Sequence, residues 1–175
     1  MHRKIAVTGH RPKGLNKVMK YGNVNDDRYV EYISLMQSTV MQYATNGYDY
    51  FISGGAIGVD LDFARAVIDT KFLLNKLNKT KIELEMALPC TDQDKKWNAE
   101  DKVRYQKILL RADKITLVSD KYSFDCMQKR NEYMVDNCDK LLAFWNGEQS
   151  GGTWNTIQYA KKVGKDIEII DLQKL

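Results

Sequence analysis

Hydrophobic and polar positions along the chain follow two alternating patterns, one typical of buried strands and one typical of amphipathic helices. Short apolar runs predict six strands, at residues 5–7, 48–52, 82–88, 115–118, 141–144 and 167–170. Between them, apolar residues at helical spacing predict helices at about residues 29–44, 59–77, 99–110, 124–135 and 153–163. Asn46 and Gly47 end the first of these helices, and Pro89 ends the third strand.

This alternation predicts an α/β protein with a three-layer Rossmann-like fold. Helical crossovers between about six strands imply a mainly parallel sheet with helices on both faces. No linker or repeat divides the chain, so residues 1–175 are expected to form a single domain. Ligands of such sheets bind at the carboxyl ends of the strands, which makes the segments after each strand the candidates. The connection over residues 9–25 is unusually long and suggests a functional loop.

The first candidate segment, Gly9-His10-Arg11, follows the first strand. Gly9 lets the backbone approach a ligand closely, and Arg11 offers a forked donor to phosphate or carboxylate. A tight turn with a solvated arginine fits these residues equally well, so this motif alone does not decide.

The second candidate segment lies between the second strand and its helix. Its candidate ligand-binding residues are Ser53, Gly54, Gly55, Gly58 and Asp60. A glycine-rich loop that opens a helix supplies amide N–H groups and a positive helix end, which suit phosphate. The segment is neither the dinucleotide motif GxGxxG nor a P-loop. Asp60 and Asp62 either favour the helix dipole or, in the case of Asp60, accept from ribose hydroxyls or act as a base.

Three further segments add candidates. Gln93 and Trp97, after the third strand, either contact a base through hydrogen bonds and stacking or serve as a helix cap and a core side chain. Gly151, Gly152 and Thr153, after the fifth strand, form a second phosphate-type loop. Arg130 and Asn131 lie on the helix before the fifth strand, where an arginine is more often a surface residue.

Composition narrows the class of protein. Its 27 Lys and Arg residues are interleaved with 23 Asp and Glu, which favours a solvated surface over a nucleic-acid-binding stripe. No apolar run approaches the roughly 20 residues of a membrane helix, and no signal peptide is recognised, so a cytoplasmic protein is expected. Cys90, Cys126 and Cys138 form no CxxC and suggest buried reduced thiols. With two histidines, no metal site is expected, and no cofactor either.

The candidate segments occur in an order that resembles the SLOG superfamily. This Rossmann-like group joins DNA-processing DprA proteins, cytokinin-activating LOG phosphoribohydrolases and YpsA-like proteins, and the YpsA-like branch is the most similar. The resemblance rests on residues 8–12, residues 54–60, Pro89 with Gln93 and Trp97, and residues 128–133. It implies a nucleotide pocket and a homodimer.

The comparison with LOG enzymes bears on catalysis. Met127-Gln128-Lys129-Arg130-Asn131 falls where LOG enzymes carry Met-x-x-Arg-Lys, whose arginine serves catalysis at a nucleoside monophosphate. Gly152-Thr153 falls where they carry Gly-Thr-x-x-Glu with a catalytic glutamate, and the corresponding residue here is Thr156. Because of this departure, the resemblance to LOG enzymes implies a nucleotide pocket more firmly than it implies hydrolase activity.

Three functions therefore compete. The first is a non-catalytic or sensory module that binds a nucleotide or a nucleotide-derived small molecule, such as an NAD- or ADP-ribose-type signal, through two glycine-rich loops. The second is a nucleoside 5′-monophosphate N-glycosidase that uses Arg130, with Asp60 in place of the missing glutamate. The third is DNA binding of the DprA type, which only the superfamily resemblance supports because clustered basic residues are lacking.

Overall fold

The protein folds into a six-stranded, wholly parallel sheet in the order β4-β3-β2-β1-β5-β6. This computed structural model describes residues 2–175. Along the chain the elements are β1 (Lys4–Gly9), α1 (Pro12–Leu15), α2 (Asp27–Thr45), β2 (Tyr50–Ser53), α3 (Val59–Lys76), β3 (Glu83–Leu88), α4 (Ala99–Leu109), β4 (Lys114–Leu117), α5 (Cys126–Asp136), β5 (Lys140–Trp145), α6 (Gly151–Lys162), β6 (Asp166–Asp171) and a closing 3₁₀ turn, Leu172–Lys174. The predicted α/β Rossmann-like fold is confirmed.

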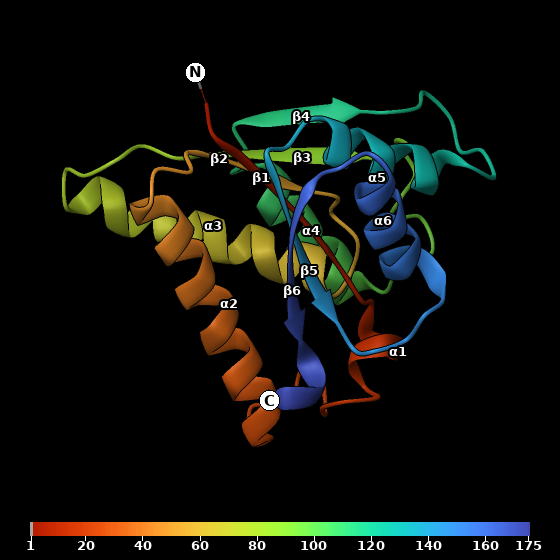
Figure 1. Cartoon of the computed structure of the whole chain (residues 1–175), viewed down its shortest axis with the longest axis horizontal. Helices are drawn as coiled ribbons and strands as arrows, with labels where there is room; N and C mark the ends of the chain where they lie inside the picture. The colour runs from red at the N-terminus through yellow and green to blue at the C-terminus, as the bar shows by residue number, and fades with distance from the viewer. Residues whose placement is uncertain (1) are drawn as a thin grey trace.

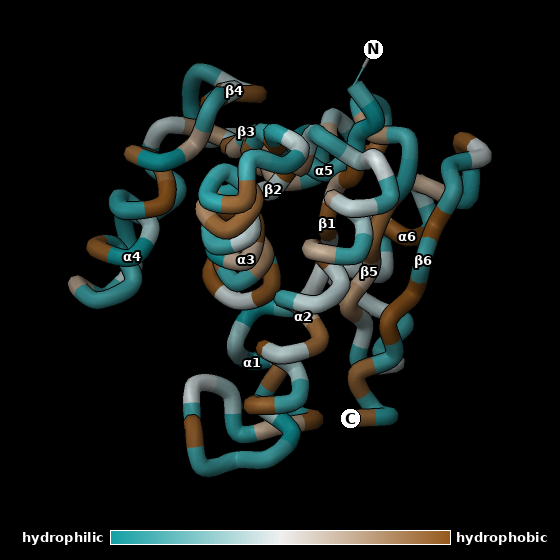
Figure 2. The backbone as a smooth tube through the Cα atoms, turned by 90° about the vertical axis from the view of Figure 1, so that its left-hand side faces the viewer, coloured by the Kyte–Doolittle hydropathy of each residue, from teal (hydrophilic) through white to brown (hydrophobic). Residues whose placement is uncertain are grey.

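The helices cover both faces of the sheet. On one face α2, α3 and α4 pack on apolar side chains of the central strands, and on the other face lie α5 and α6 (Figure 1). In Figure 2, hydrophobic and hydrophilic stretches alternate along α3, as they do in a helix that packs on a sheet. The three cysteines are buried and unpaired, as predicted.

Local signals explain where the helices begin and end. The Asp26 side chain caps α2 by accepting from the Tyr29 amide at 3.0 Å, and Asn98 caps α4 in the same way. Gly47, with φ of +88°, takes the left-handed conformation that ends α2.

The structure corrects several predicted boundaries. Strand β2 begins at Tyr50 because residues 48 and 49 belong to the irregular connection after α2, and the long connection after β1 contains the short helix α1. Helical spacing predicts an inward stripe of Tyr29, Ile33, Met36, Val40 and Ala44 on α2. Met36, Val40 and Ala44 are buried, whereas Ile33 is 38% exposed and Tyr32 is buried instead.

The sheet has a topological switch point between the paired strands β1 and β5. The helix after β1 packs on one face, and the helix after the adjacent strand β5 packs on the other. Connections that leave neighbouring strands on opposite sides open a crevice at the carboxyl end of the sheet.

Candidate functional site

A pocket of about 190 Å³ lies in this crevice, and we call it the inner pocket. It is lined by Thr8, Gly9, His10, Arg11, Ala56, Asp60, Met127, Arg130, Asn131, Met134, Gly152 and Thr153. The structure thus brings together side chains from the ends of β1 and β2 and from helices α3, α5 and α6.

Arg130 and Asp60 form a buried ion pair in the inner pocket. Arg130 is only 5% exposed. Its Nη1 donates to the Gly54 carbonyl and to Asp60 Oδ2, the latter at 3.2 Å. Its Nε has no hydrogen-bond partner among the described residues. Since buried donors in native proteins are nearly always paired, this N–H points to a missing acceptor.

Asp60 is also bonded to the loop that precedes it. Its Oδ2 accepts from the Ala56 amide at 3.2 Å, and Ser53 Oγ donates to its backbone carbonyl while accepting from the Gly55 amide. Burial raises the pKa of the Asp60 carboxyl, and the adjacent Arg130 guanidinium opposes that rise. The Gly55 and Ala56 amides are therefore already engaged within the protein.

The glycines of this loop allow close packing. A Cβ on Gly54 would overlap the Arg130 guanidinium, and one on Gly58 would overlap the His10 carbonyl oxygen. Gly55 and Gly58 also have φ of +69° and +101°, a region that other residues rarely adopt. These residues position Arg130, Asp60 and His10 in the pocket wall.

The loop after β5 differs because its amide groups are not capped by a side chain. Helix α6 begins at Gly151, two residues earlier than the sequence predicts, and Ser150 makes no capping hydrogen bond. Gly152 and Thr153 line the inner pocket beside Asn131, whereas Gly151 is exposed and does not. Free first-turn N–H groups and the positive helix end favour an anion here.

His10 connects the β1 and β5 loops. Its Nε2 accepts from the backbone N–H of Asn146 at 3.2 Å, which places the ring proton on Nδ1. Burial lowers the pKa of His10, although nearby Glu148 favours the charged form. The imidazole is therefore neutral at pH 7, and the pocket carries two guanidinium groups, of Arg11 and Arg130, against the single carboxylate of Asp60.

Gln93 and Trp97 lie in a second cavity, which we call the outer chamber. Its volume is about 510 Å³, and it is lined by Arg11, Asp92, Gln93, Lys95, Lys96, Trp97, Tyr122 and Met127. Sequence reasoning missed Tyr122 and the two lysines. The adjacency of Lys95 and Lys96 to Trp97, a basic pair beside an aromatic ring, was the available signal.

Thr156 lies outside both cavities. It is fully buried, and its hydroxyl donates to the Gly152 carbonyl one turn earlier in α6 at 2.8 Å. The residue at the position of the LOG glutamate therefore has a structural contact within the helix.

The fold and its crevice are those of a Rossmann-like α/β protein. The YpsA family model, described as "YspA SLOG family", matches residues 5–175, and the chain therefore belongs to this family. The resemblance inferred from the motifs is thus confirmed.

Two relatives illustrate the range of similarity. The SPbeta prophage-derived protein YoqJ of Bacillus subtilis (strain 168) is 38% identical over 124 residues, which are 64% of this chain and 69% of YoqJ. A UPF0398 protein of Macrococcus caseolyticus (strain JCSC5402) is 27% identical over 180 residues, covering 99% of this chain and 92% of that protein.

Among solved structures, DNA processing protein A (DprA) of Streptococcus pneumoniae has a similar fold. The TM-score is 0.61 at 14% sequence identity, over 96% of this chain. The chain spans half the length of that DprA chain, and at this identity the likeness concerns the fold alone. None of the helices between residues 2 and 175 is long and apolar enough to cross a membrane.

Proposed function

We propose that the protein binds a nucleotide or a nucleotide-derived small molecule, with its phosphate and sugar in the inner pocket. The observation that carries the proposal is the Arg130 Nε donor, which is buried in the pocket wall and lacks a partner among the described residues. A ligand oxygen would satisfy it. Family membership supports the same ligand class.

The contacts suggest how such a ligand would lie. The phosphate meets the first turn of α6 at Gly152 and Thr153, together with the Arg11 guanidinium. The sugar hydroxyls face Asp60, whose carboxylate accepts hydrogen bonds, and Asn131 adds an amide. Because the Gly55 and Ala56 amides are engaged internally, the loop after β2 supports the pocket, and the loop after β5 supplies the phosphate contacts.

Calorimetric titration with the 5′-monophosphates of adenosine, guanosine, cytidine and uridine tests this proposal. At least one should bind the wild-type protein, and Arg130→Lys should weaken it about tenfold or more, because lysine lacks the guanidinium fork. Arg104→Lys is the matched control, since Arg104 pairs with a different buried carboxylate, Asp62, away from the inner pocket. Unchanged affinity in a folded Arg130→Lys variant would contradict the proposal.

One observation favours a hydrolase as the second candidate, namely that the Asp60 carboxylate lines the pocket where a sugar would lie. Cleavage of an N-glycosidic bond needs a carboxylate to stabilise the cationic sugar, and Thr156 cannot supply that charge. Asp60 is itself held by Arg130 and the Ala56 amide. We therefore expect binding without release of free base. Turnover at ordinary enzymatic rates, lost in Asp60→Asn, would establish the hydrolase instead.

A further inference from the structure

The inner pocket and the outer chamber share a boundary. Arg11 and Met127 line both cavities, and Arg11 Nη2 lies 4.0 Å from Met127 Sδ. The inner pocket, at about 190 Å³, is smaller than the roughly 300–1,000 Å³ of most small-molecule sites, whereas the outer chamber, at about 510 Å³, falls within that range. A ligand anchored in the inner pocket therefore has room to continue past Arg11 and Met127 into the outer chamber.

Gln93, which lines the outer chamber, has a buried side-chain acceptor without a partner among the described residues. The side chain is only 8% exposed, and its Nε2 donates to the Gly55 carbonyl at 3.1 Å and lies 3.4 Å from the Tyr105 hydroxyl. These contacts fix the amide orientation and leave Oε1 without a partner among the described residues. A ligand donor, such as an exocyclic amine or a hydroxyl, would satisfy this oxygen.

Two aromatic residues, Trp97 and Tyr122, line the chamber. Trp97 is half-buried, with its ring edge-on to Tyr105 at a centroid distance of 5.1 Å. Tyr122, on the loop between β4 and α5, is 72% exposed. Exposed aromatic side chains at a cavity are suited to stack on a planar ring such as a nucleobase.

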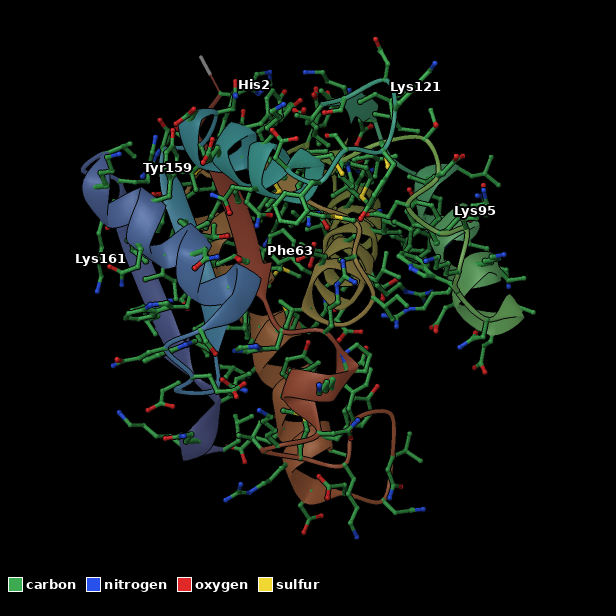
Figure 3. All side chains as sticks on the ribbon, turned by 90° about the vertical axis from the view of Figure 1, so that its right-hand side faces the viewer. His2, Phe63, Lys95, Lys121, Tyr159 and Lys161 are labelled. Carbon is green, nitrogen blue, oxygen red and sulfur yellow. The ribbon has the colours of Figure 1, made fainter. Side chains whose placement is uncertain are left out.

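The charges of the chamber favour an anion. Arg11, Lys95 and Lys96 face a single carboxylate, Asp92, and none of the four takes part in an ion pair with a described residue. In Figure 3, Lys95 lies at the right-hand edge of the molecule and Lys121, which does not line the chamber, at its upper edge. Unneutralised cations in a concave site attract negative groups more strongly than the same cations on a flat surface.

We propose that the ligand is a nucleotide with two separate anionic groups, one on each side of Arg11 and Met127. The first is the phosphate of the inner pocket, so the inference rests on the proposed function. The base lies in the outer chamber between Trp97 and Tyr122, with a donor to Gln93 Oε1. The second anionic group meets Lys95 and Lys96. The ligand class is thus a nucleoside bisphosphate and not a simple monophosphate.

Calorimetric titration of the wild-type protein with a nucleoside 5′-monophosphate and the matching 3′,5′-bisphosphate, for each of four bases, tests this inference. The preferred bisphosphate should bind at least tenfold more tightly than its monophosphate. Lys95→Ala/Lys96→Ala should remove that difference and leave the monophosphate affinity within about twofold. Lys121→Ala, which removes an exposed lysine that does not line the chamber, should change neither.

Two aromatic variants check the position of the base. Tyr122→Ala should weaken both nucleotides about tenfold, the scale of one stacked base. Phe124→Ala is the control, because Phe124 lies on the same loop, is fully exposed and does not line the chamber.

The outcomes separate the two proposals. If the monophosphate binds in an Arg130-dependent way and the bisphosphate binds no more tightly, only the second anionic group is overturned. The same conclusion holds if the bisphosphate advantage survives in the double lysine variant. If none of the nucleotides binds, the proposed function fails and this inference with it.

Discussion

Arg130 shows how a single side chain can serve both stability and binding. Its guanidinium pairs with Asp60 and donates to the Gly54 carbonyl, and its Nε–H has no partner among the described residues. Removing one member of a buried pair costs more than the pair contributes, because the remaining charge is left without a partner in a poorly solvated place. Stability and ligand affinity at this position can be separated by comparing single and double variants.

Arg130→Met should lower the free energy of unfolding by about 3–5 kcal/mol, because Asp60 then stays buried and uncompensated. Asp60→Leu combined with Arg130→Met should be less destabilised than the two single changes added together. Urea unfolding followed by circular dichroism measures all three variants. Strict additivity would show that the two groups do not interact.

A second prediction at the residue scale concerns Gly58. Gly58→Ala introduces a Cβ that overlaps the His10 carbonyl, whereas Gly22→Ala, at the similar φ of +84°, has no atom within 4 Å. Both variants place an alanine at positive φ, which costs about 1–3 kcal/mol, but only Gly58→Ala adds a steric clash. Thermal unfolding should therefore rank Gly58→Ala clearly below Gly22→Ala. Equal melting temperatures would contradict the close packing at Gly58.

At the scale of elements, Asp62 connects the first half of the chain to α4. Its carboxylate, on α3, accepts from Tyr32 of α2 at 2.7 Å, from Tyr21 of the β1–α2 connection and from Arg104 of α4. Asp62 is thus no simple helix-dipole residue. These donors hold the long connection after β1, whose beginning supplies Gly9, His10 and Arg11 to the inner pocket.

Tyr32→Phe should cost about 1.5–3 kcal/mol, since it removes a buried hydrogen bond to a charged acceptor. Tyr29→Phe is the matched control, because Tyr29 belongs to the same aromatic cluster but its hydroxyl makes no hydrogen bond with a described residue. Chemical unfolding of both variants gives the comparison. A loss of similar size in the two variants would mean that the Asp62 contact contributes little.

At the scale of the whole molecule, acid should destabilise the fold through His10. The pKa of His10 is lowered in the folded state, mainly by burial, so the unfolded chain binds the proton more readily. The contribution of neutral His10 to the free energy of unfolding is fully present above the ordinary pKa of about 6.5. It is lost as the pH falls through the lower pKa that His10 has in the folded state. The expected slope is at most about 1.4 kcal/mol per pH unit.

Unfolding free energies of the wild type and of His10→Gln between pH 8 and pH 5 measure this contribution. His10→Gln should be less stable at pH 8 yet show a flatter decline below pH 6.5. If His10→Gln keeps the wild-type slope, other groups cause the acid sensitivity.

The sequence by itself determined the order of strands and helices, the parallel sheet and the family. Periodicity and turn residues are local properties, and they place five helices and six strands within a few residues of their observed positions. The start of α6 was missed because glycine has a low helix propensity, so Gly151 and Gly152 resemble a loop when only local sequence is considered.

Only the tertiary structure decided what each candidate residue touches. The sequence assigned free amides to the loop after β2, but Ser53 and Asp60 occupy the Gly55 and Ala56 amides. It could not place Arg130 opposite Gly54, because 76 residues separate them and only the packing of α5 on the sheet brings them together. Periodicity reports the buried face of an element, whereas pairing among polar groups depends on how separate elements pack, and that packing created both cavities.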